Sequence, residues 1–504
     1  MSSFATADPA STDPDSTEEN QGWTLRLILS LVSICLVLEM LTISYLMVAT
    51  ALPEMIGHYQ TTQGAWVLSA FLLSGAVTSP ILGKLSDMYG KRRMLLLAIS
   101  CAAAGAVISA VAPNFGVVVL GRVFQGLLVP CMFLSYSLMR DVYPARILAL
   151  AVSIATGGMG LITIPSPWLT GWLLDTSGFR AVFWFFAIVL AVLAVVVRLT
   201  TAESKVRVRS RVDYLGALLL GAGLAGVLTG VSMEADWGWS SARTIGCLVG
   251  GFVILAIWLV TALRVREPLI DVRFFRRRSM SLTAVAGGLT FANTAVYSTL
   301  LPMLCMTPAI LGLHYGFGVD AEGYAIFQAP IGAASVVGGL LVGLTISRVP
   351  AKWLLITGSL LLALGSSMTG LVNDSRGVVI VWAAIQGLGL GLCYAATPNL
   401  VIQAVPGELQ GSMASMVQVF QGAFSAAVPV VVFTVLNSGT VTVLKGSIFY
   451  SNSGLTIGFL IGGATALVAA LVAVALPQRT LGAAPAARKA DAEPAPLRAT
   501  TVTG

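Results

Sequence analysis

The chain has 504 residues, of which 57% are hydrophobic and only 10% are charged. A soluble globular protein carries about 25% charged residues, so a water-soluble fold is excluded and we expect an integral membrane protein. The formal net charge of +7 is accounted for by the membrane topology described below, and it requires no nucleic-acid partner.

Apolar segments long enough to cross a bilayer occur fourteen times along the chain. Each has about the 20 residues that a helix needs to span a ~30 Å hydrocarbon core. The predicted spans are 24–49, 64–83, 94–112, 116–138, 147–172, 179–198, 213–233, 245–263, 279–305, 322–346, 352–371, 377–399, 410–436 and 454–476. The polar ends of the chain, 1–22 and 478–504, are expected to be disordered cytoplasmic tails.

The basic residues follow this segmentation. With the N-terminus inside, 24 of the 29 Lys and Arg residues fall on cytoplasmic segments, four fall on external loops, and Arg122 lies within a span. This asymmetry is what the positive-inside rule requires. We therefore expect a multi-pass protein of the cell inner membrane, with both termini in the cytoplasm and its basic side against the anionic inner leaflet.

A short basic loop, Gly-Lys-Leu-Ser-Asp-Met-Tyr-Gly-Lys-Arg-Arg, joins the second and third spans. Its pattern resembles the signature loop between helices 2 and 3 of the major facilitator superfamily of transporters. The resemblance implies that Asp87 latches the two halves of the protein near Gly411, at the start of the thirteenth helix, where the helix dipole favours an anion. Alternatively, the basic residues only set topology, which leaves Asp87 unexplained. The implied gating residues of the loop are Gly83, Asp87, Gly90, Lys91, Arg92 and Arg93.

Two markers recur at nearly the same distance along the chain. Gly83 and Gly343 end equivalent spans 260 residues apart, and Gln-Gly-Leu at 125–127 recurs at 386–388. Either the two halves are duplicated, as in transporters with parallel six-span repeats, or these abundant residues match by chance. With duplication, we expect six-helix bundles at 23–199 and 279–477, separated by a linker at 200–278 that contains two extra spans.

The linker ends with Arg-Glu-Pro-Leu-Ile-Asp-Val-Arg-Phe-Phe-Arg-Arg-Arg at 266–278. Its mixture of basic and apolar residues favours an interfacial segment on the inner leaflet. Six spans, two inserted spans, this linker and six more spans resemble the fourteen-span drug:proton antiporter, or multidrug efflux, family. The resemblance implies an all-α fold of two six-helix bundles with two inserted helices, alternating access, and a proton gradient in place of any cofactor.

Arg122 is the only basic residue that lies more than three residues inside a predicted span. An intramembrane arginine costs at least ~2.5–3.5 kcal/mol and is expected to face a polar cavity or an acid. The alternative is that it snorkels to the nearby outer surface. The sequence Arg122-Val-Phe-Gln125-Gly126 also resembles the Arg-x-x-Gln-Gly motif of helix 4 in the family, which implies that Gln125 and Gly126 take part in gating.

Glu39 is the only acid deep within a predicted span. Its depth, ~22 Å from the inner edge at 1.5 Å per residue, matches the ~21 Å of Arg122, so the two side chains are placed to meet across the first bundle. We expect Glu39 to couple proton transfer, with Arg122 or a cationic substrate favouring release of its proton. A purely structural ion pair is the alternative.

The chain departs from the resembled family in two helices. The family has an acid nine residues before the Pro of an Ala-Leu-Pro sequence, but Ser44 stands nine residues before Pro53. The family's Gly-Pro-x-x-Gly-Gly motif of helix 5 reads Ser-Pro-Trp-Leu-Thr-Gly here, at 166–171. Pro167 and Gly171 keep that pattern, and a kink in this helix is still expected from its prolines.

Polar residues within the spans are candidates for substrate contacts. Asn293 and Tyr297 share one face of the ninth span by their i, i+4 spacing. Each candidate has an alternative role as a helix–helix hydrogen bond, worth ~0.6 kcal/mol on average. The set comprises Glu39, Asn293, Tyr297, Gln328 and Gln386, with Asn399, Gln418 and Gln421 as further possibilities.

Absent motifs narrow the function. The chain has no Gly-x-x-x-x-Gly-Lys-[Ser/Thr] loop for ATP, and its only histidines, His58 and His314, lie in predicted external loops away from any zinc spacing. We expect a secondary active transporter and not an enzyme, monomeric, exporting amphipathic drugs by proton-coupled antiport and conferring antibiotic resistance. The alternative is an importer or facilitator of a small anionic metabolite that is anchored by Arg122.

Overall fold

The structure is a computed structural model, and the described part of the chain excludes both tails and several short loop segments. The described ranges are 23–61, 65–162, 165–207, 213–232, 237–265, 268, 272–273, 278–308, 315–319, 323–405, 410–438, 440–444 and 447–477. The predicted tails and most of the predicted interfacial segment 266–278 therefore lie outside the described residues.

The described part of the first bundle contains six long helical segments, here called rods, and two of them are interrupted by a 3₁₀ turn. Its fourth rod breaks at a 3₁₀ turn just before Pro130, which caps α6 and cannot donate a backbone hydrogen bond. The fifth breaks at a second 3₁₀ turn and resumes after Pro165. The elements are α2 (Leu25–Tyr59), α3 (Ala65–Tyr89), α4 (Lys91–Ala110), α5 (Phe115–Gln125), η1 (Gly126–Leu128), α6 (Cys131–Val142), α7 (Ala145–Gly157), η2 (Gly158–Gly160), α8 (Ser166–Ser177) and α9 (Phe179–Thr200).

The second bundle also contains six rods, and none of them is divided by a 3₁₀ turn in its described part. They are α13 (Arg278–Met306), α14 (Ala325–Thr345), α15 (Ala351–Leu371), α16 (Arg376–Ala404), α17 (Gln410–Ser438) and α18 (Asn452–Val474). An antiparallel hairpin of β1 (Thr440–Leu444) and β2 (Ser447–Tyr450) joins α17 to α18. The described chain is otherwise helical, as expected, and this short hairpin is an addition that the sequence did not predict.

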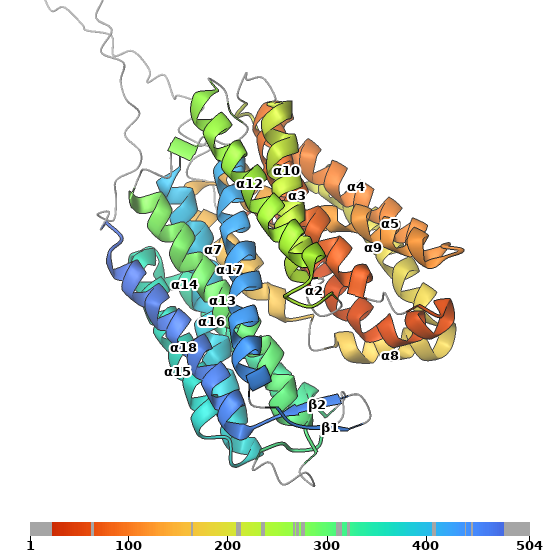
Figure 1. Cartoon of the computed structure of the whole chain (residues 1–504). Coiled ribbons are helices and arrows are strands. Elements are labelled where there is room, and N and C mark those ends of the chain that lie inside the picture. Colours follow the sequence, from red (N-terminus) through yellow and green to blue (C-terminus); the bar gives the residue numbers. More distant parts are fainter. Residues whose placement is uncertain are drawn as a thin grey trace, which may run out of the picture.

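The inserted helices are α10 (Tyr214–Ser232) and α12 (Ala242–Arg264). They pack along each other, and α10 also packs on α3 of the first bundle and α17 of the second. In Figure 1 this pair lies side by side next to α3. Its apolar contacts include Leu220, Leu224 and Trp258, which share a cluster with residues of α13, α16 and α17. The pair therefore covers part of the seam between the two bundles.

Equivalent glycine contacts support the predicted repeat. A Cβ on Gly126 would collide with the carbonyl oxygen of Phe71, and a Cβ on Gly387 would collide with that of Ile331. These partners are 261 and 260 residues apart, the same separation that the sequence markers show. Glycine at both positions allows the fourth rod of each bundle to approach the second closely.

The membrane-spanning character of the chain is clear, but the number of crossings stays a prediction. In the described part of the chain, eleven helices are long and apolar enough to span a bilayer, and α7 and α10 contain shorter apolar helices. Each of the fourteen predicted segments contains helix in the structure. The expected fourteen crossings are compatible with this arrangement without being established by it.

The basic loops gather at one end of the molecule, here called the basic end; the opposite end carries the β1–β2 hairpin. Near the basic end the two bundles touch closely. Arg140 donates to the carbonyl of Val405 at 2.7 Å, and a Cβ on Gly339 would lie 2.5 Å from the Cα of Gly157. By their positions in α6, α7, α14 and α16, these contacts lie in the half of the bundles nearest that end, so the described conformation is closed there.

Candidate functional site

Arg122 is fully buried inside the first bundle and does not reach the surface. Its Nε donates to the carbonyl of Val67 at 2.9 Å, and its Nη1 donates to Ser44 Oγ at 3.2 Å and to Gln125 Oε1 at 2.7 Å. The guanidinium carbon lies 4.4 Å from the centre of the Phe71 ring. The side chain thus ties α5 to α2 and α3, and snorkelling to the outer surface does not occur.

Glu39 is also buried, with 6% of its surface exposed. It lies against the interruption of the fifth rod: its Oε1 is 3.9 Å from the position of a Cβ on Gly158, and the backbone of Ile162 forms a hydrogen bond with its carboxyl group. Its Oε2 has no hydrogen-bond partner among the described residues. The acid therefore rests on the short η2 segment with half of its carboxylate unused.

The structure does not bring Glu39 and Arg122 together. No ion pair joins them among the described residues, whose salt bridges all involve other groups. Glu39 and Ser44 are five residues apart on α2, so their side chains diverge by about 140° around the helix. Ser44 faces Arg122, so Glu39 faces the fifth rod instead. Similar depths in the membrane do not determine toward which side of α2 each side chain points.

A small cavity of about 40 Å³ lies between the bundles, enclosed by α6 and α7 on one side and α13, α16 and α17 on the other. Aromatic side chains dominate it. Phe291 and Tyr394 stack with their ring centres 4.4 Å apart, opposite Phe133 and Tyr136. A space of this size accommodates only a few water-sized molecules, so a drug-sized ligand requires the bundles to separate further.

Two glutamines supply polar atoms to this cavity, Gln418 and Gln421. Gln418 Nε2 donates across the bundle seam to the carbonyl of Val129 at 3.1 Å, beside the break in the fourth rod. Its Oε1 has no hydrogen-bond partner among the described residues. Both glutamines were secondary candidates from the sequence, and they are the polar candidates that the structure places at the cavity.

The other polar candidates make contacts within the second bundle. Asn293 Nδ2 donates to the carbonyl of Gly462 at 2.8 Å, and Gln386 Nε2 donates to Asn293 Oδ1 at 2.7 Å. Tyr297 shares a 3.1 Å hydrogen bond with Thr369. Gln328 accepts from Tyr324 at 3.0 Å, and Asn399 donates to a carbonyl of its own helix at 2.7 Å. The contacts of Asn293, Gln386 and Tyr297 match helix–helix bonding, the alternative considered for each residue. Those of Gln328 and Asn399 stay within one helix.

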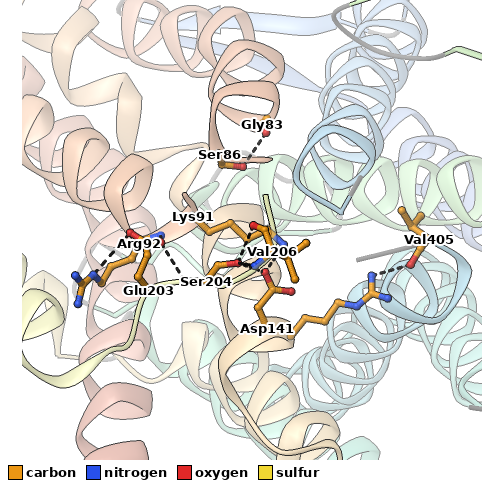
Figure 2. A network of polar contacts seen from close by, with 10 residues as sticks. Gly83, Ser86, Lys91, Arg92, Asp141, Glu203, Ser204, Val206 and Val405 are labelled. Carbon is orange, nitrogen blue, oxygen red and sulfur yellow. Dashed lines mark hydrogen bonds and ion pairs between the residues drawn. The ribbon is translucent and has the colours of Figure 1, made fainter. Parts of the chain in front are cut away.

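A polar network lies at the basic end of the first bundle (Figure 2). Lys91, at the start of α4, is completely buried and forms a 2.6 Å salt bridge with Asp141 of α6. Asp141 Oδ2 also accepts from Ser204 Oγ at 2.5 Å. Ser204 belongs to the segment that follows α9. The network therefore joins the third rod, the fourth rod and the beginning of the linker.

Glu203 caps the N-terminus of α4 within the same network. Its carboxylate accepts the backbone amides of Arg92 at 2.9 Å and Arg93 at 3.2 Å. Gly90 precedes them with φ 114°, and a Cβ there would lie 3.0 Å from the carboxylate. Glycine is thus required both by the positive φ and by the approach of the acid. An anion at a helix N-terminus is favoured by the helix dipole.

Asp141, Glu203 and Ser204 were not identified from the sequence. Asp141 stands beside Arg140 at the end of an apolar span, and Glu203 and Ser204 lie in a linker that also contains several basic residues. The available signal was the presence of acids next to a strongly basic loop. Their partners, 50 and about 110 residues away, could not be assigned from spacing alone.

The remaining gating candidates occupy varied surroundings. Asp87 is 3% exposed, and its helix α3 packs along α17. The carbonyl oxygen of Gly83 accepts a hydrogen bond from the hydroxyl of Ser86 at 2.7 Å. Gly171 has no neighbouring atom within 4 Å of an added Cβ. Pro167 lies in the first turn of α8, so the interruption of the fifth rod falls where prolines were expected to bend it. The latch role of Asp87 stays a proposal.

Comparison with known proteins addresses the family directly. The family model described as Major Facilitator Superfamily matches residues 32–429. The chain belongs to the Major Facilitator Superfamily. Its members are membrane transporters, and this chain is accordingly a multi-pass membrane transporter for a small-molecule substrate and not an enzyme.

Similar curated proteins include a multidrug resistance protein Stp of Mycobacterium tuberculosis (strain CDC 1551 / Oshkosh), 28% identical, covering 82% of this chain and 75% of Stp. The tetracenomycin C resistance and export protein of Streptomyces glaucescens is also 28% identical, covering 70% and 65% of the two chains. Among solved structures, the human organic anion transporter MFSD10 matches with a TM-score of 0.61 at 13% identity, covering 92% of this chain and all of MFSD10. At that identity the last likeness shows the fold alone.

Proposed function

We propose that this transporter exports amphipathic drugs or similar small molecules in exchange for protons. The named resistance and export functions of its relatives support the direction of transport and the class of substrate. The proposed energy source is the proton gradient, since Glu39 offers a site for a proton and no ATP-binding loop is present in the sequence. We place the protein in the cell inner membrane as a monomer, with both termini and the basic end in the cytoplasm.

The observation that carries the proposal is the position of Glu39. One oxygen of this buried carboxyl group has no hydrogen-bond partner among the described residues. Burying such a group costs little free energy when it is protonated and much more when it is charged. An intramembrane acid of this kind is a default candidate for a proton or cation pathway. Opening the surroundings of Glu39 to water or to a cationic substrate would release its proton, which is the exchange that antiport requires.

The η2 segment offers a physical connection between this acid and the cavity. Glu39 Oε1 lies 3.9 Å from the position of a Cβ on Gly158, at one side of the segment. The adjacent Met159 Sδ accepts a 3.8 Å contact from the hydroxyl of Tyr136, a residue that lines the cavity. A short 3₁₀ stretch within a helix is a common place for a hinge. We propose that substrate entering the cavity shifts η2 and thereby changes the exposure of Glu39.

Alternating access supplies the transport step. The two bundles are related by the repeat, and transporters of this kind rock one bundle against the other around a site near the membrane midplane. The described conformation is closed at the basic end by the hydrogen bond from Arg140 to the carbonyl of Val405 and by the contact of Gly157 with Gly339. Export then requires these contacts to separate so that substrate enters the cavity from the cytoplasm.

Dye efflux in everted membrane vesicles tests the function. We expect dye to accumulate in vesicles that contain the protein when an imposed pH gradient is present, and to stop accumulating when the gradient is collapsed. Purified protein should release protons on addition of the same dye. Accumulation that is equal with and without the gradient would refute proton coupling.

Glu54→Gln provides a matched control for Glu39→Gln, since both acids lie on α2. Glu54 is exposed and accepts the backbone amide of Phe179 at 3.1 Å, away from the cavity. We expect Glu39→Gln to abolish drug-induced proton release, Glu39→Asp to retain part of it, and Glu54→Gln to resemble the unmodified protein. Unchanged proton release from Glu39→Gln would exclude Glu39 as the coupling group.

A further inference from the structure

The first bundle contains a buried cation without a carboxylate beside it. Arg122 is fully enclosed, and among the described residues it forms no salt bridge. Glu39 is the only acid deep within a predicted span, and it faces the fifth rod. The acceptors around the guanidinium are a backbone carbonyl, a hydroxyl and a carboxamide. These neutral groups satisfy hydrogen bonds but do not neutralise the charge.

Two hydrogen-bond donors of this cluster are unused. Arg122 Nη2 and Gln125 Nε2 are both buried and have no hydrogen-bond partner among the described residues. They belong to side chains that are bonded to each other, since Arg122 Nη1 donates to Gln125 Oε1 at 2.7 Å. Nη2 belongs to the same guanidinium as Nη1, and Nε2 belongs to the same carboxamide as Oε1. Each unused donor therefore lies next to one end of that hydrogen bond. One acceptor placed between them is able to receive both N–H groups.

From this geometry we propose that Arg122 and Gln125 form the binding site of a small monovalent anion, with chloride as the inorganic ligand that fits it. An anion would accept the two unused N–H groups and balance the buried positive charge, and hydrogen bonds that involve a charged partner are the stronger ones. The proposal rests on the contacts of Arg122 and is independent of the role proposed for Glu39.

The surroundings of the cluster favour a small ligand. The Phe71 ring covers one face of the guanidinium, and Arg122, Ser44 and Gln125 are absent from the lining of the central cavity. All three side chains are completely buried. A drug-sized anion does not fit beside so enclosed a group, whereas a monatomic anion such as chloride is only somewhat larger than a water molecule. We therefore assign the site to a structural or regulatory anion and not to the transported drug.

Ser44 provides a decisive variant. Its Oγ lies 3.2 Å from Arg122 Nη1, so Ser44→Asp places a fixed carboxylate beside the guanidinium and replaces the charge of the bound anion. Ser44→Asn introduces a side chain of similar size without charge and is the matched control. Because both variants retain Arg122, the comparison does not depend on the folding of an Arg122 variant, although Arg122→Gln is a useful third protein.

The measurement is the thermal unfolding midpoint of the purified full-length protein, followed by tryptophan fluorescence. Potassium chloride replaces potassium gluconate at constant ionic strength, because gluconate is too large for the site. Ligand that binds only the folded state raises the midpoint with concentration. We expect a rise with chloride in the unmodified protein and in Ser44→Asn, and at least a tenfold weaker apparent affinity in Ser44→Asp and Arg122→Gln.

Acetate and bromide distinguish the source of the anion. A response to bromide like that to chloride supports an inorganic halide, whereas a response to acetate alone retains the anion site but assigns it to a carboxylate. The proposal is overturned if none of these anions raises the midpoint of the unmodified protein, which is the result expected if water occupies the site. It is equally overturned if Ser44→Asp responds to chloride as strongly as Ser44→Asn does.

Discussion

The buried Lys91–Asp141 pair gives the sharpest stability prediction. The side chains are 0% and 4% exposed, and Lys91 Nζ lies 2.6 Å from Asp141 Oδ2. Removing one partner of a buried pair leaves the other charge without compensation and costs about 3–5 kcal/mol. We expect Asp141→Leu to cost about this much. Lys91→Met should fall near the lower end, because Ser204 Oγ still donates to Asp141 at 2.5 Å.

The double variant behaves differently. Replacing a buried ion pair with apolar residues of similar volume is commonly neutral or stabilising by about 1–4 kcal/mol. Lys91→Met with Asp141→Leu should therefore be more stable than either single variant. The coupling between the two positions is then at least about 3 kcal/mol, the upper part of the range for residues in contact.

Thermal unfolding of the four purified proteins measures this coupling. For a unit the size of the first bundle, one kcal/mol shifts the midpoint by about 2–4 °C, so each single variant should unfold at least roughly 6 °C lower. Arg93 and Glu203 provide a control pair at 3.9 Å, with side chains 64% and 18% exposed. Their coupling should stay below about 1 kcal/mol. Single effects at Lys91 and Asp141 that add within about 0.5 kcal/mol would refute the reasoning.

Three further predictions concern the seam, the cavity and the linker. Gly339→Val adds a side chain where even a Cβ would lie 2.5 Å from the Cα of Gly157. The larger side chain should prevent closure of the basic end, so dye efflux should fall at least about tenfold. Gly171→Ala is the control: an added Cβ there has open space around it, so efflux should be retained. Tyr394→Leu removes an aromatic ring from the wall of the cavity; loss of one aromatic contact with a bound dye, worth about 0.5–1.5 kcal/mol, should lower dye affinity measured by equilibrium binding roughly 2- to 12-fold. Glu203→Gln removes the anionic cap of α4 and should lower the stability of the purified protein by about 1 kcal/mol in thermal unfolding, with a smaller loss at high salt.

Much of the fold was predictable because membrane helices obey two strong rules. A span must be apolar over about 20 residues, and basic loops mark one side, so all fourteen predicted segments contain helix in the structure. The interruption before Pro130 was missed because residues 126–134 around it are uniformly apolar, and hydropathy does not register a break there. The β1–β2 hairpin was missed for a related reason, since it lies in a loop that was treated only as a connection.

The candidate site was predicted less completely. Sequence reasoning identified Glu39 and Arg122 as unusual and estimated similar depths for them, because hydropathy and rise per residue determine depth. The direction of each side chain depends on how α2 is rotated against its neighbours, which no single-sequence pattern specifies. Ser44, judged only as a departure from the family pattern, proved to be the residue of α2 that contacts Arg122.

The two bundles differ in the way they use the same motif, and this difference locates the proposed proton chemistry. In the first bundle, the glutamine of the Gln-Gly motif, Gln125, accepts from the charged Arg122. In the second, its counterpart Gln386 donates to the neutral Asn293, which in turn donates to a backbone carbonyl. Deep within the predicted spans, an acid and a base occur only in the first bundle, as Glu39 and Arg122, whereas Glu322 and Lys352 stand at the first positions of their spans. If a carboxylate within the membrane couples protons to transport, it therefore belongs to the first bundle, while the second supplies the Phe291–Tyr394 aromatic wall of the cavity. An exporter whose drug-induced proton release survived the loss of Glu39 would need a carboxylate that the interior of the second bundle's spans does not contain.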